Sequence, residues 1–224
     1  EKYFRENADR KWVTELIKGV SDKDFSDTKA CILTSHLKST TYSGDCPGDI
    51  FINYVLAPRI KNEMLRDWRP AIQSCFSDNR EQLKKDPRLL TEWIKKNIQI
   101  NDTANKHSRT PLSPGGVYKL RVADTYSVQL FFVAVCRALG IPSRLNPATS
   151  EPEYYSGNAW HRAAFTGNQP SNPETGFLDL KNGINSIEPQ YAVHFTIGRL
   201  INGNYTTLDY DFARKISDFK EPLK

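Results

Sequence analysis

The chain of 224 residues lacks the long apolar runs and the one-sided charge that mark membrane-spanning and nucleic-acid-binding proteins. Its longest uninterrupted apolar run, Leu130 to Cys136, is far shorter than the roughly 20 residues that a bilayer requires. Its 31 Lys and Arg are spread among 26 Asp and Glu, which leaves a mild net charge of +5. A nucleic-acid footprint needs clustered basic residues. The sequence therefore predicts neither a transmembrane segment nor a nucleic-acid partner.

Cysteine is scarce, and its spacing excludes the common zinc motifs. The four cysteines form no C-x-x-C pair, so we expect no zinc site. We expect no other metal and no cofactor. Cys136 lies within the apolar run and is expected to pack in the core. A disulfide among Cys31, Cys46 and Cys75 requires an oxidising compartment, and the sequence leaves its pairing open.

Methionine is also nearly absent. The single methionine is Met64, and no positively charged leader followed by an apolar stretch is present. We therefore expect the chain to be a processed form or a fragment of a longer protein.

With 38% hydrophobic and 11% aromatic residues the chain can bury a core, and 25% charged residues are typical of an ordinary soluble protein. Apolar periodicity predicts helices and alternation predicts strands. The expected helices are 11–20, 27–37, 61–76, 87–98 and 125–139, and the expected strands are 159–165, 177–180 and 191–197. A turn at Asn202-Gly203 predicts a C-terminal hairpin. We expect an N-terminal helical region over residues 1–84 that packs on an α+β core over residues 85–224.

The most informative segment is Arg137-Ala138-Leu139-Gly140-Ile141-Pro142-Ser143-Arg144, which closes the apolar helix after Thr125. Gly140 fits a helix C-cap, and Pro142 prevents the helix from continuing. With Ala123-Asp124-Thr125 before the helix and Asn158-Ala159-Trp160 after it, residues 87–162 resemble a transglutaminase-like domain. That family has a papain-like fold, with a buried central helix on an antiparallel sheet.

The resemblance implies a Cys-His-Asp triad for acyl transfer, but the thiol and the imidazole are missing here. Thr125 stands twelve positions before Arg137, where the family has its cysteine, and Asn158 stands where it has its histidine. Asp179 is the best match to the aspartate. An internal threonine lacks the strong base that its hydroxyl needs in order to attack. We therefore expect no catalytic residues, and Asp124-Thr125 is expected to act as a helix cap.

Two residues leave room for a rearranged triad. His161 follows Asn158 by three positions in an expected strand, so the two side chains should point to opposite faces unless a bulge intervenes. Cys136 lies about three turns into the helix, away from its N-terminal field. His36, His107 and His194 adjoin no nucleophile in any motif.

The loop and strand after the helix lie where the family places the mouth of its cleft. Adjacent tyrosines offer flat apolar area together with hydroxyl groups, a surface that suits sugars and peptides. The possible groove residues are Glu153, Tyr154, Tyr155, Trp160 and Arg162.

The sequence thus favours a catalytically inactive binding or scaffolding module of a larger secreted, periplasmic or cell-surface bacterial protein. The segment Tyr54 to Arg69 supports this, because it resembles a stretch that precedes the core in some large bacterial proteins. The expected partner is a peptide, a glycan or a neighbouring domain of the same polypeptide. The alternative is an active hydrolase or acyltransferase with a rearranged triad.

Overall fold

The computed structural model describes residues 10–61, 63–103, 110–163, 165, 176–183, 187–201, 204–210, 212–220 and 223. The chain divides into two compact units. The first unit comprises Glu1–Leu145 and Glu151–Phe165, and the second comprises Asn146–Ser150 and Thr166–Lys224. The boundary expected near residue 85 lies inside the first unit, and the division into 1–84 and 85–224 stays a prediction.

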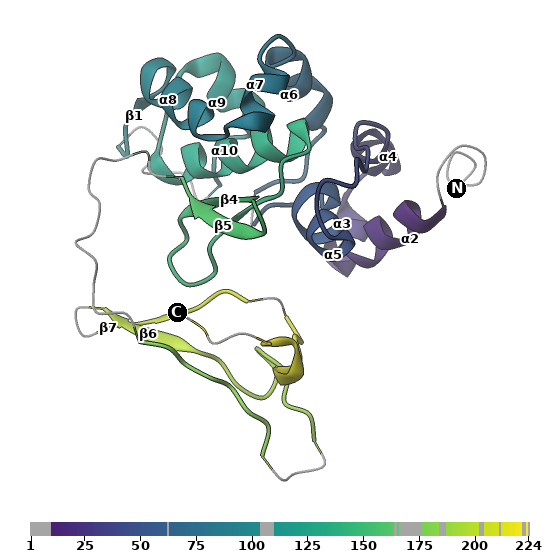
Figure 1. The fold of residues 1–224 in the computed structure, drawn as a ribbon, viewed down its shortest axis with the longest axis vertical. Coiled ribbons are helices and arrows are strands. Elements are labelled where there is room, and N and C mark those ends of the chain that lie inside the picture. Colours follow the sequence, from purple (N-terminus) through teal and green to yellow (C-terminus); the bar gives the residue numbers. More distant parts are fainter. Residues whose placement is uncertain are drawn as a thin grey trace. The chain divides into compact units, whose positions relative to one another are not determined.

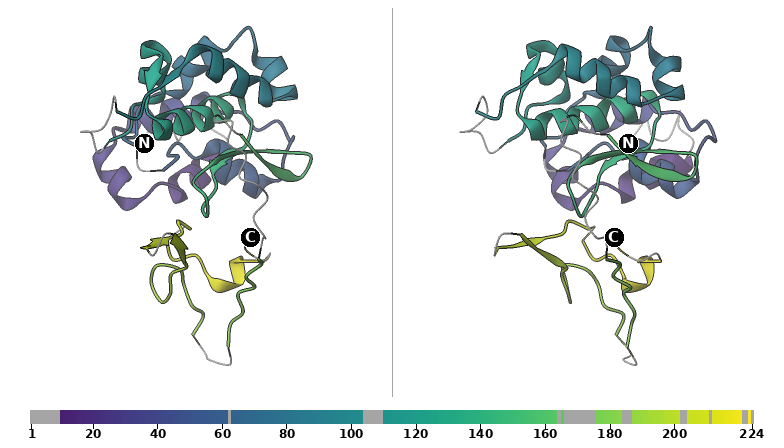
Figure 2. Two further views of the ribbon diagram at one scale, coloured as in Figure 1. Left: turned by 90° about the vertical axis from the view of Figure 1, so that its left-hand side faces the viewer. Right: turned by 60° about the vertical axis from the view of Figure 1, so that its left-hand side comes forward.

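The first unit is mainly helical, with two small sheets (Figures 1 and 2). Its helices are α2 (Arg10–Lys18), α3 (Asp22–Asp27), α4 (Ala30–Lys38), α5 (Gly48–Phe51), the π-helical turn η1 (Ile52–Leu56), α6 (Arg69–Cys75), α7 (Arg80–Lys85), α8 (Arg88–Asn97), α9 (Pro114–Leu120) and α10 (Thr125–Leu139). The short strands β1 (Gln99–Ile100) and β2 (Val122–Ala123) pair in parallel, and β3 (Ser143–Leu145), β4 (Pro152–Ser156) and β5 (Ala159–Arg162) form an antiparallel sheet in that order.

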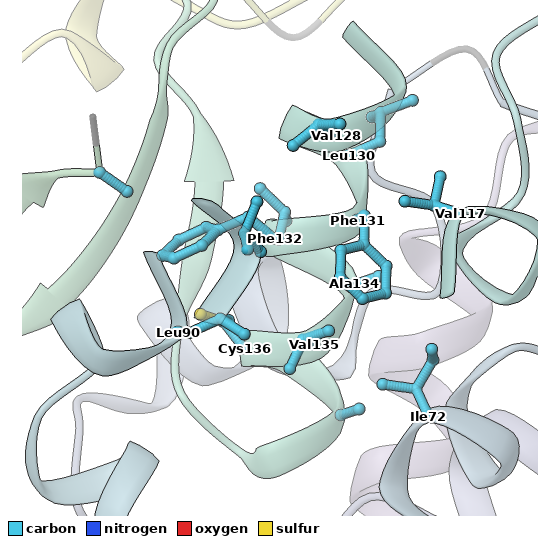
Figure 3. Packing of buried hydrophobic residues seen from close by; sticks show 14 of the residues in the cluster. Ile72, Leu90, Val117, Val128, Leu130, Phe131, Phe132, Ala134, Val135 and Cys136 are labelled. Atoms are coloured by element: carbon cyan, nitrogen blue, oxygen red, sulfur yellow. The ribbon is translucent and has the colours of Figure 1, made fainter. Parts of the chain in front are cut away.

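The central helix α10 lies between a layer of helices and the antiparallel sheet (Figure 1). Helices α6, α7, α8 and α9 contact it on one side, and β3 and β4 contact it on the other. Phe131 and Phe132 leave the helix in different directions (Figure 3). Phe131 lies within ring-contact distance of Phe76, and Phe132 within that of Tyr154. The expected burial of this helix and its packing on an antiparallel sheet are confirmed.

Both ends of α10 are fixed by local chemistry. The Asp124 carboxylate accepts hydrogen bonds from the Ser127 amide at 2.9 Å and the Ser127 hydroxyl at 2.6 Å. This satisfies amide groups that the first turn of a helix leaves unpaired. At the other end Gly140 adopts φ 85°, a left-handed conformation that glycine accepts without strain. The cap and the terminator expected from the sequence are both present.

A second apolar cluster of the first unit is formed by α2, α4, α5 and η1, and a buried arginine joins it to α10. The Arg137 side chain is 3% exposed. Its guanidinium donates to the carbonyls of Ala57 and Arg59 at 3.1 and 2.8 Å and to the carbonyl of Ser143 at 2.9 Å. Burial lowers the pKa of Arg137 to about 10, so it stays charged at neutral pH. The arginine of the closing motif therefore ties the N-terminal segment, the helix and the first strand together.

A second buried guanidinium completes this connection. Arg69 is fully buried and donates to the carbonyls of Val55 and Arg137, both at 2.7 Å. Its Nε donates to Nδ1 of His36 at 3.3 Å, while His36 Nε2 lies 2.9 Å from the Arg66 carbonyl. Because Nδ1 accepts and the carbonyl can only accept, the ring is neutral with its proton on Nε2.

The second unit contains a small aromatic cluster and a hairpin. Strands β6 (Gly198–Ile201) and β7 (Asn204–Thr207) pair antiparallel, and η2 is a 3-10 turn over Ile216–Asp218. Tyr191 contacts the rings of Phe195, Tyr210 and Phe219. The predicted C-terminal hairpin is confirmed, but the turn residues Asn202 and Gly203 lie outside the described residues.

The strand expected over 159–165 ends at Arg162, and three other expected elements differ more. The helix expected over 61–76 is reduced to α6, because the Glu63 carboxylate binds the amides of Ile60 and Lys61 and holds that stretch in a loop. Pro70 accordingly sits in the first turn of α6, where a missing amide costs little. The strand expected over 191–197 is a turn that precedes β6, and the one over 177–180 is a single bridge between Leu178 and Leu223. Alternation of apolar residues along the sequence does not distinguish a turn or an isolated bridge from a strand.

We predict that stability falls in acid because of His36. Burial, followed by the charge of Arg69, lowers its pKa from 6.5 to about 4. The unfolded chain therefore binds more protons between these values, and stability present above pH 6.5 is lost as the pH falls toward 4, by about 3 kcal/mol. Urea unfolding at pH 7 and pH 4 measures this loss. His36→Gln keeps an acceptor for Arg69 and a donor for the Arg66 carbonyl but cannot be protonated, so it should remove most of this loss of stability in acid. If the variant showed the same pH dependence as the wild type, the loss would not come from His36.

Candidate functional site

Thr125 is the first residue of α10 and is bound by a carboxylate from another segment. Its backbone amide donates to Asp102 Oδ1 at 2.7 Å, and its hydroxyl lies 3.2 Å from Asp102 Oδ2. The parallel pairing of β1 with β2 explains the contact. The register sets Ile100 beside Ala123, so the residues two positions later, Asp102 and Thr125, also lie beside each other.

This contact gives the start of α10 a chemistry unlike that of a cysteine enzyme. A helix N-terminus favours negative charge, and Asp102 supplies it. A thiolate at the same place would face this carboxylate and be disfavoured by it. A carboxylate is also a weak base toward an alcohol, which ionises far less readily than a thiol. Thr125 therefore takes part in capping the helix, together with Asp102 and Asp124.

Asn158 lies at the tip of the hairpin between β4 and β5. Gly157 and Asn158 both have positive φ, 57° and 62°, which is the two-residue turn that fits the twist of a hairpin. Asparagine tolerates this conformation better than most residues. The turn alone is thus a sufficient reason for asparagine at this position.

The hairpin tip is remote from Thr125. The Tyr155 amide donates to the Pro142 carbonyl at 2.8 Å, so the tip lies beside the turn that ends α10. Thr125 begins the same helix, about 20 Å away along its axis for 15 residues at 1.5 Å each. The structure therefore does not bring Thr125 and Asn158 together.

Asp179 belongs to the second unit. Its side chain is exposed and forms an ion pair with Lys181 at 2.9 Å. Its role as the third member of the triad stays a prediction. His107 lies outside the described residues.

The two groups considered for a rearranged triad are also separate from Thr125. Cys136 is completely buried, and burial raises the pKa of its thiol. His161 pairs across the sheet with Tyr154, and its Nε2 lies 2.9 Å from the Ser156 carbonyl. Cys136 lacks the exposure that a nucleophile requires, and the exposed His161 contacts a backbone carbonyl through Nε2 instead of a nucleophile. All four cysteines are free thiols, and Cys31 and Cys75 are exposed.

Four of the five possible groove residues share the outer face of the sheet, together with Arg144. We define the outer face by five side chains, those of Arg144, Glu153, Tyr155, Trp160 and Arg162. The Arg144 guanidinium lies 4.0 Å from the ring centre of Trp160 and forms an ion pair with Glu153 at 3.0 Å. Arg162 pairs with Glu151. Trp160 also contacts the rings of Tyr155 and Tyr54.

Tyr154 differs from the other four, because it points to the opposite face. It is 7% exposed and packs against Phe132 and His161. Adjacent residues of a strand point to opposite sides, so Tyr154 and Tyr155 cannot line one surface. By the same rule His161 lies on the face of Tyr154, opposite to Trp160, whereas Asn158, from which His161 was expected to point away, lies in the turn before the strand.

Comparison with known proteins assigns this region to a family. Residues 72–168 match the model of the transglutaminase-like superfamily. The chain contains a transglutaminase-like domain. No curated protein and no solved structure matched the chain.

The match covers the α+β arrangement described above, from the middle of α6 to a few residues past β5, and supports a papain-like core. It extends beyond the segment 87–162 that carries the motifs. In this transglutaminase-like domain the closing motif fulfils a structural role through Arg137, whereas the start of α10 carries Thr125.

Sequence reasoning missed Asp102 as a partner of Thr125. The only signal was the parallel pairing of two two-residue strands, which no local pattern reveals. The turn propensity of Gly157-Asn158, by contrast, was readable in the sequence.

Among the residues that the structure describes, no group of three or more His, Cys, Asp or Glu is placed to hold a metal ion. No helix within the described ranges is long and apolar enough to cross a membrane.

Proposed function

We propose that the transglutaminase-like domain is a non-catalytic binding or scaffolding module. The observation that carries this proposal is the contact between Thr125 and Asp102, in which both the amide and the hydroxyl of Thr125 are bound to one carboxylate. The position that holds the nucleophile in the family is thus occupied by an alcohol that faces an anion. Asn158, at the histidine position, lies in the turn at the other end of the helix.

The outer face is the binding surface that the geometry favours. Trp160 and Tyr155 are partly exposed, and their ring centres lie 5.3 Å apart with the ring planes inclined at 63°, so together they present an aromatic patch. Arg144 with Glu153, and Arg162 with Glu151, border this patch with paired charges. Aromatic area bordered by hydrogen-bonding groups suits a peptide or a glycan, and it also suits a neighbouring domain of the same polypeptide.

The wider setting rests on the family resemblance. We propose that the domain belongs to a larger secreted, periplasmic or cell-surface bacterial protein, because the stretch Tyr54 to Arg69 resembles one that precedes such domains in large bacterial proteins. The structure gives that stretch a role beside α10, since the carbonyls of Val55, Ala57 and Arg59 accept from the two buried arginines.

The alternative of a rearranged triad makes the opposite prediction for reactive probes. We expect iodoacetamide to label the exposed Cys31 and Cys75 at the rate of ordinary thiols, and serine-reactive phosphonates to label nothing. Peptide mass spectrometry after labelling identifies the modified residues. Modification of Thr125, or of the buried Cys136 in the folded protein, would contradict the non-catalytic assignment.

The outer face can be tested on arrays of oligosaccharides and of peptides. Trp160→Ala should weaken any wild-type interaction about tenfold or more, because a central aromatic residue commonly carries such an effect. Phe25→Ala is the matched control, since Phe25 is 58% exposed on α3. Equal binding by wild-type protein and Trp160→Ala, with both folded by circular dichroism, would remove the outer face from the proposal.

A further inference from the structure

A recess of about 580 Å³ opens on the other side of the same hairpin. Its walls come from the corner between α7 and α8 and from the inner side of β4 and β5. The lining residues used below are Gln82, Lys85, Arg88, Leu89, Tyr154 and His161. The volume is within the range of sites that hold a small molecule or the end of a peptide.

The charges around the recess leave one cation without an opposing acid. Asp86 also lines it, but both carboxylate oxygens are bound by Arg88, through Nε and Nη2, each at 2.8 Å. That hydrogen bonding lowers the pKa of Asp86 and keeps it ionised. No described ion pair involves Lys85, so its ammonium group is the positive charge that the recess can offer to a ligand.

The remaining walls are formed mainly by rings and apolar side chains, with the amide of Gln82 and the hydroxyl residue Ser156 among them. The rings of Tyr154 and His161 lie nearly parallel, with centres 5.4 Å apart, and form a floor. Leu89, 45% exposed, forms an apolar side. The exposed side-chain amide of Gln82 can donate and accept at once, as a peptide group requires.

We propose that this recess binds a carboxylate that is attached to a short apolar group, with Lys85 holding the carboxylate. The chemistry is shared by the free C-terminus of a peptide and by a small free carboxylic acid. The inference rests on the binding role proposed above but uses the face of the hairpin opposite to Trp160. It therefore fails or succeeds separately from the outer face.

A carboxylate fits better than a phosphate group. A phosphate dianion needs several donors, and it is commonly held by the fork of an arginine. In this recess the fork of Arg88 is already bound to Asp86, whose negative charge also disfavours a dianion. A single ammonium beside an apolar wall matches a monoanion.

The experiment is a titration of the full chain followed by calorimetry and by ¹⁵N chemical shifts. N-acetyl-alanyl-alanine represents the peptide C-terminus, its C-terminal amide removes only the charge, propionate represents a free acid, and inorganic phosphate represents the dianion. We expect the dipeptide acid to bind about tenfold or more tightly than the amide, because a charge-assisted contact is lost. The shifts of Tyr154 and His161 should move, and those of Trp160 should not.

Lys85→Gln should weaken binding of the dipeptide acid by about tenfold, and binding of the amide should not change. Lys96→Gln is the matched control, because it makes the same charge change at an exposed position near the far end of α8.

Equal binding of propionate and the dipeptide acid would assign the site to free acids within the same chemistry. Equal binding of acid and amide, tighter binding of phosphate, no effect of Lys85→Gln, or no binding of any carboxylate would overturn the proposal. None of these outcomes bears on the probe labelling of Thr125.

Discussion

The guanidinium of Arg137 is the group on which the first unit depends. It lies in the core at the end of α10 and reaches carbonyls on two segments that are far apart in the sequence, residues 57–59 and Ser143. Removing a buried charge from water costs several kcal/mol unless hydrogen bonds replace the water. Here those bonds require the N-terminal segment and the sheet to be in place, so the folding of the two is linked. Arg69, bound to the carbonyl of Arg137, extends the same linkage to His36.

This constraint explains why one end of the helix can keep the family pattern while the other changes. The arginine, glycine and proline after α10 determine where the helix stops and where β3 begins, and any change there would disturb the core. The start of α10 requires only a cap. Asp102 and Asp124 provide one by binding the amides of Thr125 and Ser127. The packing of the scaffold therefore does not require a cysteine at the start of α10, which supports the proposal of a module that binds through its surfaces.

The features readable from the sequence were those set by local chemistry. Asp124, Gly140 and the apolar run between them predict α10 to within a residue, and the alternation of β5 predicts opposite faces for Trp160 and His161. The features missed depend on contacts between distant segments. The Glu63 carboxylate, which turns an expected helix into a loop, and the Asp102 carboxylate, which meets Thr125 through parallel pairing, leave no periodic signal. The positions Thr125 and Asn158 could be aligned with a family motif, but their separation required the hairpin register.

The most direct measurement of the central claim is the pKa of a thiol placed at the start of α10 by Thr125→Cys. It is obtained from the pH dependence of alkylation at that residue, followed by mass spectrometry. The Asp102 carboxylate opposes ionisation there, so we expect a pKa no lower than the ordinary value of about 8.5, and a lower pKa when Asp102→Asn is added. A thiol that ionises below about pH 7 in the single variant would show that a cation or base lies within reach of this position, and would contradict the proposed loss of the reaction centre.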